Sequence, residues 1–194
     1  MIAGHFGFAA AVKSRETATP LWALMLASVW LDIVFAPLLF GGVETIEKIP
    51  GARPYGGMII HADYTHSLVG ALLLSIALSV PAILAWGRRS GVVVGLVAFS
   101  HWLLDLPVHR GDMPLLPGNA GHFPKLGFGL WSHPAIAAGV ELILVVAGTW
   151  LYWRAANGVA IAAGRGKRWV VANSLMLLVF GCLVLALDFT GPGS

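Results

Sequence analysis

The stretch YTHSLVGALLLSIALSVPAILAW, residues 64–86, contains no Asp, Glu, Lys or Arg. An apolar run of roughly 20 residues is long enough to cross the hydrocarbon core of a bilayer as a helix. Only 11% of the whole chain is charged and 58% is hydrophobic, whereas about a quarter of the residues of a soluble domain are charged. So few charges cannot cover a water-exposed surface. The sequence therefore favours a membrane protein over the alternative, a soluble all-helical core.

Four further stretches approach the same length with one charged residue each. They are residues 20–43 with Asp32, 91–108 with Asp105, 131–153 with Glu141 and 169–190 with Asp188. The sequence predicts an all-α fold, a polytopic transmembrane helical bundle forming one integral membrane domain over residues 1–194. We expect about five spans, at residues 20–43, 62–86, 91–108, 131–154 and 168–189, and a short membrane helix within residues 1–15.

The basic residues divide unequally between the loops when the spans are threaded alternately through the bilayer. One side collects Lys13, Arg15, Arg88, Arg89, Arg154, Arg165, Lys167 and Arg168, and the other collects Lys48, Arg53, Arg110 and Lys125. Because basic loops remain in the cytoplasm, the first side is predicted to be cytoplasmic.

This threading brings histidines and carboxylates from distant parts of the chain to the outer leaflet. The residues concerned are His5, Asp32, His61, Asp63, His66, His101 and Asp105. Asp63 and His66 are three residues apart and His101 and Asp105 four apart, so each pair would share one face of a helix. These positions predict a single polar site near the outer ends of the spans.

The interiors of the five expected spans contain no lysine or arginine. Each intramembrane carboxylate must therefore take a proton, pair with a charged histidine or bind a metal. Neutral imidazole and carboxylate groups form a ligand set for zinc, and also for Mn or Fe. We predict a divalent metal centre of one or two ions, zinc first, that is bound by His5, His61, His66, His101 and Asp105. Asp32 and Asp63 would be further ligands or the catalytic general base.

Blander interpretations remain open for several of these residues. Asp32 could be a protonated packing residue that bonds to Ser28, and Glu141 is either a buried hydrogen-bond partner or a site residue. Four residues in or beside the long outer loop are expected to be solvated rather than ligating. They are His109, Asp112, His122 and His133.

The order of the polar motifs resembles that of the YdjM-like family, bacterial inner-membrane proteins that are also labelled LexA-binding and are regarded as metal-dependent hydrolases. The resemblance covers about the first 120 residues. It rests on Gly4-His5, on Asp32, on the His-x-x-x-Thr-His-Ser stretch of His61, Thr65, His66 and Ser67, and on Ser100-His101-x-x-x-Asp105 followed by a proline.

The chain departs from the family pattern at two places. Asp32-Ile33-Val34-Phe35 stands where the family often has Asp-x-Asp-His, and His61-Ala62-Asp63 stands where it often has His-Arg-Gly. Two potential ligands are missing as a result, while Asp63 is a possible replacement for one of them. The number of metal ions therefore stays open between one and two.

The resemblance implies a multi-pass protein of the bacterial inner (plasma) membrane, and the division of the basic residues predicts that its site faces the periplasmic or outer side. If it is an enzyme, a metal-activated water would hydrolyse a lipid-like or phosphoester substrate. Arg110 and Lys125 would hold an anionic group such as a lipid phosphate. The expected partner is membrane lipid and not nucleic acid. The alternatives are a transporter or proton or metal relay, and a non-catalytic metal-binding membrane partner protein.

Overall fold

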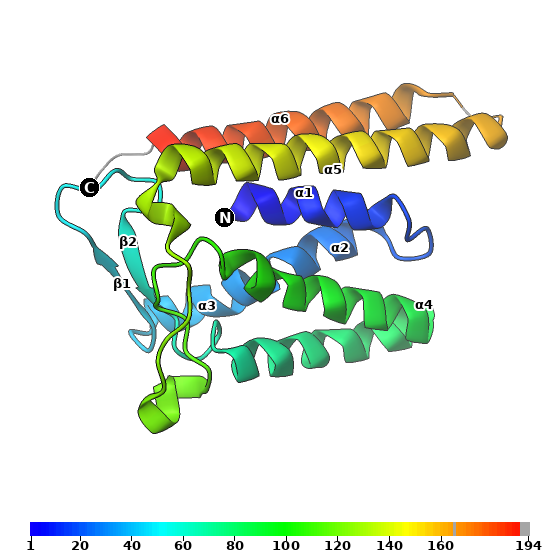
Figure 1. The fold of residues 1–194 in the computed structure, drawn as a ribbon. Coiled ribbons are helices and arrows are strands. Elements are labelled where there is room, and N and C mark those ends of the chain that lie inside the picture. Colours follow the sequence, from blue (N-terminus) through cyan, green and yellow to red (C-terminus); the bar gives the residue numbers. More distant parts are fainter. Residues whose placement is uncertain (165, 191–194) are drawn as a thin grey trace.

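The computed structural model describes residues 1–164 and 166–190 and is mostly helical (Figure 1). Arg165, one of the basic loop residues, lies outside the described residues. The elements are α1 (Ile2–Lys13), α2 (Leu21–Ser28), α3 (Trp30–Phe40), β1 (Thr45–Lys48), β2 (Met58–His61), α4 (Leu68–Asp105), the short 3-10 turns η1 (Pro117–His122) and η2 (Leu130–Ser132), α5 (Pro134–Ala162) and α6 (Arg168–Thr190).

Within the described residues, three helices are long and apolar enough to cross a membrane: α4, α5 and α6. The bent pair α2 and α3, which meet at 47°, would make a fourth as one broken span. The prediction of a helical membrane protein is thus supported. The expected number of five spans is larger than the three or four that these helices provide, because α4 alone covers two of the expected spans.

Helix α4 folds back on itself, as Figure 1 shows, and the break in the helix lies at Gly87. Gly87 has φ 84° and ψ 167°, outside the helical region, in a conformation that is essentially restricted to glycine. The two arms then pack so closely that a Cβ on Gly91 would lie 2.8 Å from the backbone nitrogen of Ile83. The glycine-containing break therefore converts one long helix into an antiparallel hairpin.

The short helix α1 lies between the α5–α6 pair and the remaining helices (Figure 1). A Cβ on Gly7 would lie 2.7 Å from the backbone nitrogen of Val145, and one on Gly148 would meet the carbonyl of Gly7. Small residues allow such close approach of helices in membranes. At the start of α1, Glu141 accepts hydrogen bonds from the Gly4 amide at 3.0 Å and the Tyr55 hydroxyl at 2.8 Å. Glu141 is thus a buried hydrogen-bond partner that holds α1 to α5.

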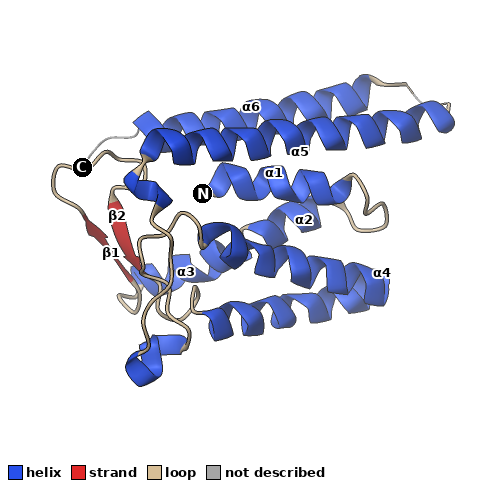
Figure 2. Cartoon of the chain, in the orientation of Figure 1, coloured by secondary structure: helices blue, strands red, loops and turns tan. Residues whose placement is uncertain are grey.

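A small antiparallel sheet adds to the expected all-α fold. Strands β1 and β2 pair with Thr45 opposite His61 and Lys48 opposite Met58, and Figure 2 shows this hairpin beside the helix ends. Its β-branched residues, such as Ile59 and Ile60, favour strands. The sequence did not predict this hairpin, because it lies between two long apolar runs.

The two sets of loops that the sequence separates lie at opposite ends of the bundle (Figure 1). We call the end with the α1 N-terminus, the β-hairpin and residues 107–133 the site end. The other, the basic end, carries the Gly87 turn and the α5–α6 connection.

Candidate metal centre

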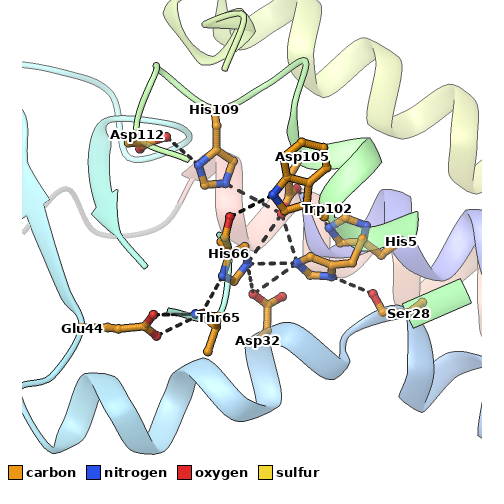
Figure 3. Close-up of polar contacts among 11 residues, drawn as sticks. His5, Ser28, Asp32, Glu44, Thr65, His66, Trp102, Asp105, His109 and Asp112 are labelled. Carbon is orange, nitrogen blue, oxygen red and sulfur yellow. Dashed lines mark hydrogen bonds and ion pairs between the residues drawn. The ribbon is translucent and has the colours of Figure 1, made fainter. Parts of the chain in front are cut away.

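Six histidine and carboxylate side chains meet inside the site end of the bundle (Figure 3). They come from α1, α3, the turn before α4, the second arm of α4 and the loop that follows it. The residues are His5, Asp32, His66, His101, Asp105 and His109. All are buried except Asp32, whose side chain is 35% exposed.

Three donor atoms form a nearly equilateral triangle. The Nε2 atoms of His66 and His101 are 3.3 Å apart, and Oδ1 of Asp32 lies 3.6 Å from the first and 3.5 Å from the second. Ligands at about 2.1 Å from a tetrahedral metal are expected about 3.4 Å from one another. The triangle therefore has the dimensions of one face of a tetrahedral site.

Asp105 supplies a second carboxylate to the same cluster. Its Oδ2 lies 3.0 Å from Nε2 of His101 and 3.8 Å from Nε2 of both His66 and His109. Its Oδ1 lies 3.2 Å from Nε2 of His5, whose ring stacks on that of His101 at a centroid distance of 3.9 Å. Asp105 thus contacts four imidazoles at once.

The break between α2 and α3 orients His101. Val29 leaves the helical region with φ −118° and ψ 18°, and at this break the carbonyl oxygen of Ser28 accepts a hydrogen bond from Nδ1 of His101 at 2.8 Å. Because Nδ1 then carries the proton of the neutral ring, Nε2 presents a lone pair to the cluster.

His66 is oriented through a hydroxyl. Oγ1 of Thr65 lies 2.9 Å from Oε2 of Glu44 and 2.9 Å from Nδ1 of His66. Glu44 also accepts hydrogen bonds from the amides of Tyr64 and Thr65. The Thr65 hydroxyl therefore donates a hydrogen bond to this carboxylate and accepts a hydrogen bond from Nδ1–H of His66. Nε2 of His66 is again left as a lone pair. Outer-shell partners of this kind fix the tautomers of metal-binding histidines.

With these tautomers, the residues of the cluster present their lone pairs and charges in a way that fits a metal ion. When both rings are neutral, the two Nε2 lone pairs face each other at 3.3 Å and repel one another, and the neighbouring carboxylates of Asp32 and Asp105 have no lysine or arginine partner among the described residues. A divalent cation relieves both problems, and the groups His5, His101 and Asp105 and Asp32, His66 and His101 could each hold an ion. The donor set of imidazoles and carboxylates suits zinc, Mn or Fe.

A cavity of about 210 Å³ adjoins the cluster. Asp32, His66, Asp105 and His109 lie in its wall, together with Phe35, Tyr55, Met58, Ile60 and Trp131. His5 and His101 are not among the lining residues and are fully covered. The cluster thus has one closed side and one side on which a small molecule has room.

Some predicted site residues are not brought to the cluster. His61 lies in β2 with its Nε2 3.4 Å from Oε2 of Glu47, because the hairpin register directs it there. Asp63 forms an ion pair with Lys125 at 2.6 Å. Arg110 donates hydrogen bonds to Gly56, Trp131 and Ser132. Asp63, Lys125 and Arg110 thus hold loops of the site end together.

His109 and Asp112 correct an expectation, since the structure buries both instead of solvating them. Nδ1 of His109 donates to Oδ1 of Asp112 at 2.8 Å, and Oδ2 of Asp112 accepts from the Ile60 amide at 3.0 Å. Burial alone would raise the pKa of Asp112, but the hydrogen bonds from His109 and from the Ile60 amide hold this pKa below its ordinary value. The three-residue spacing was the only local signal for this pair, and Glu44 had none.

No family model, curated protein or solved structure matches the chain. Five of the residues that carry the sequence resemblance are nevertheless close in space, since His5, Asp32, His66, His101 and Asp105 all belong to the cluster, whereas His61 does not. The chemistry of the site is therefore inferred from these residues and their geometry.

Proposed function

We propose that the protein is a membrane-embedded metal-dependent hydrolase, as its resemblance to the YdjM-like family implies. The observation that supports this most is the triangle of Asp32, His66 and His101, with sides of 3.3 to 3.6 Å, beside a cavity. His66, His101, Asp32 and Asp105 would hold the ion, and zinc is the first choice for this set. His5 would support His101 and Asp105 from behind.

The bound ion would supply a Lewis acid that lowers the pKa of a coordinated water toward neutrality. Proton transfer at the site is assigned to His109. Its Nδ1 is held by Asp112 at 2.8 Å while its ring lines the cavity, the arrangement in which a carboxylate orients a histidine general base. His109 therefore takes the role that the sequence suggested for Asp63.

The cavity suits an apolar substrate. Aromatic and aliphatic side chains dominate its wall, and no lysine or arginine is among the described lining residues. Arg110 and Lys125 are engaged elsewhere. A lipid-like ester that brings its carbonyl to the ion is thus favoured over a phosphoester that needs a basic clamp.

The proposed topology keeps five spans. The bent pair α2 and α3 forms one, the two arms of α4 form two, and α5 and α6 complete the set. Because the expected cytoplasmic loops carry eight of the twelve basic residues, the basic end would face the cytoplasm and the metal centre would lie at the outer leaflet of a bacterial inner membrane.

Metal analysis of two matched histidine variants tests this function. His101→Ala removes a buried donor of the cluster, whereas His61→Ala removes an imidazole that faces Glu47 in the β-hairpin. We expect detergent-purified wild type and His61→Ala to contain near-stoichiometric metal and to hydrolyse a long-chain ester, and His101→Ala to lose both. Equal metal content in the two variants, or none in the wild type, would contradict the proposal.

A second candidate function is a non-catalytic metal-binding partner protein. Asp32, His66, His101 and Asp105 would supply four protein donors to one ion, the number found in closed structural sites. Wild-type protein that retains its metal and has no hydrolytic activity on carboxylic or phosphoric esters would support this alternative.

A further inference from the structure

A second cavity, of about 940 Å³, lies at the basic end of the bundle. It is bounded by the end of α1 and the loop after it, by the last turns of α5 and by the first residues of α6. This cavity is separate from the metal centre, and none of the proposed metal ligands lines it.

One face of α5, together with Ala163 just after its last residue, forms the apolar wall of this cavity. Its lining residues follow helical spacing: Tyr152, Ala155, Ala156, Val159, Ala160 and Ala163. Residues three and four apart lie above one another on a helix. Because four of the six are alanines, the wall is smooth and the space beside it stays open.

Three cations stand at the cavity, and its described lining contains no carboxylate: Lys13, Lys167 and Arg168. Nζ of Lys13 donates to the carbonyls of Thr17 at 3.0 Å and Thr19 at 2.7 Å, leaving one of its three protons. The side chains of Lys167 and Arg168 are exposed. The nearby Glu16 pairs with Arg89 at 3.1 Å and its charge also acts on Lys13. The charges of Lys167 and Arg168 face no carboxylate within the described lining of the cavity.

We propose that this cavity binds one anionic glycerophospholipid. The phosphate lies among Lys13, Lys167 and Arg168, and an acyl chain runs along the alanine face of α5. Trp169, 80% exposed at the same place, is a residue type that concentrates at the level of lipid headgroups. A basic pocket between helices on the cytoplasmic side is the expected receptor for such a headgroup. A soluble anion would use the cations but leave the apolar wall uncovered.

Native mass spectrometry of the detergent-purified protein with added lipids tests this proposal. The probes are phosphatidylglycerol, phosphatidylcholine with the same acyl chains, and soluble glycerol phosphate. We expect phosphatidylglycerol to bind at least tenfold more tightly than either of the others. The double variant Lys167→Gln/Arg168→Gln should lose roughly fivefold in affinity per cation removed. Ala156→Phe, which fills the cavity without changing charge, should weaken phosphatidylglycerol binding as well.

The matched control is Arg15→Gln/Arg88→Gln, which removes two exposed cations from the same end but outside the cavity lining. This control should bind phosphatidylglycerol like the wild type. Equal binding of the two lipids by the wild type would overturn the proposal, and so would equal losses in the two double variants. Glycerol phosphate that binds as tightly as phosphatidylglycerol would replace the lipid with a free phosphate compound.

Discussion

Nε2 of His66 and Nε2 of His101 lie 3.3 Å apart, while the Nδ1 atom of each ring bonds to an oxygen on its other side. Neither nitrogen of the close pair has a proton to share when both rings are neutral. Such an arrangement is costly in a buried site unless a cation lies between the lone pairs. The cost of this contact is the physical reason to expect a metal, and it depends on neighbours from distant parts of the chain: Ser28 at the end of α2, and Thr65 and Glu44 outside the helices.

Asp105→Asn tests the charge of the central carboxylate. The amide keeps the volume of the side chain but is a neutral and poorer ligand, so we expect loss of metal and of hydrolysis while the fold persists. If Asp105 were a protonated structural residue, the amide could still form hydrogen bonds and the change would be nearly harmless. Metal content and melting temperature are measured in the same detergent. An unchanged metal content would remove Asp105 from the essential ligands.

Thr65 tests the chain of hydrogen bonds from Glu44 to His66. Thr65→Val keeps the shape of the side chain and removes the hydroxyl that lies 2.9 Å from Nδ1 of His66. We expect metal affinity to fall by roughly 10- to 100-fold, the usual effect of losing an outer-shell partner. Thr65→Ser, the control, keeps the hydroxyl and should stay within a few-fold of the wild type. Competition with a chromogenic chelator measures the metal affinity of both variants. A Thr65→Val protein that binds metal as tightly as the wild type would show that the chain of hydrogen bonds does not support the site.

The sequence predicts the helical runs and most of the cluster because both depend on simple physics. Charge-free stretches of bilayer length must be helical, and buried histidines and acids must find one another. His5, Asp32, His66, His101 and Asp105 could therefore be placed together by threading the spans.

The parts of the site that the sequence does not predict depend on contacts between distant segments. Asp63 and His66 do not share a helix face, because α4 begins only at Leu68, where Ser67 caps it through the Gly70 amide at 3.0 Å. His61 lies away from the site because the register of the β-hairpin places it opposite Thr45 and next to Glu47. His109 is buried by a loop whose backbone bonds, such as Trp131 to the Val108 carbonyl, have no local pattern in the sequence.

Gly87→Ala tests the turn that divides α4. At φ 84° and ψ 167° any side chain is strained, and we expect a loss of about 1–3 kcal/mol of unfolding free energy. Gly139→Ala in α5 is the control, because no atom lies within 4 Å of the added Cβ and alanine favours a helix by up to about 1 kcal/mol. Melting temperatures in one detergent compare them. A Gly87→Ala protein as stable as Gly139→Ala would contradict the strained turn.

Glu16 gives the basic end a pH dependence. Burial alone would raise the pKa of Glu16, but hydrogen bonds from the Ala18 and Thr19 amides and the charge of Arg89 hold this pKa below its ordinary value. A carboxyl with a lowered pKa stabilises the fold fully above its unfolded pKa, about 4.3, and this contribution is lost as the pH falls through the folded pKa. Glu16→Gln cannot titrate. The melting temperature of the wild type should therefore exceed that of Glu16→Gln at pH 7, and the gap should close below about pH 4. A gap that does not change with pH would show that Glu16 acts only through its shape.

Thiol labelling tests which end of the bundle faces the cytoplasm. In a Cys182→Ser background, Ala120→Cys places an exposed thiol in the loop of the site end, and Arg88→Cys places one at the turn of α4. Because the basic end is predicted to be cytoplasmic, an impermeant thiol reagent added to intact bacterial cells should label Ala120→Cys. It should reach Arg88→Cys only after lysis. Both variants label in lysed cells, so each protein is its own control for thiol reactivity. The opposite pattern would place the metal centre at the cytoplasmic face and the lipid cavity in the outer leaflet.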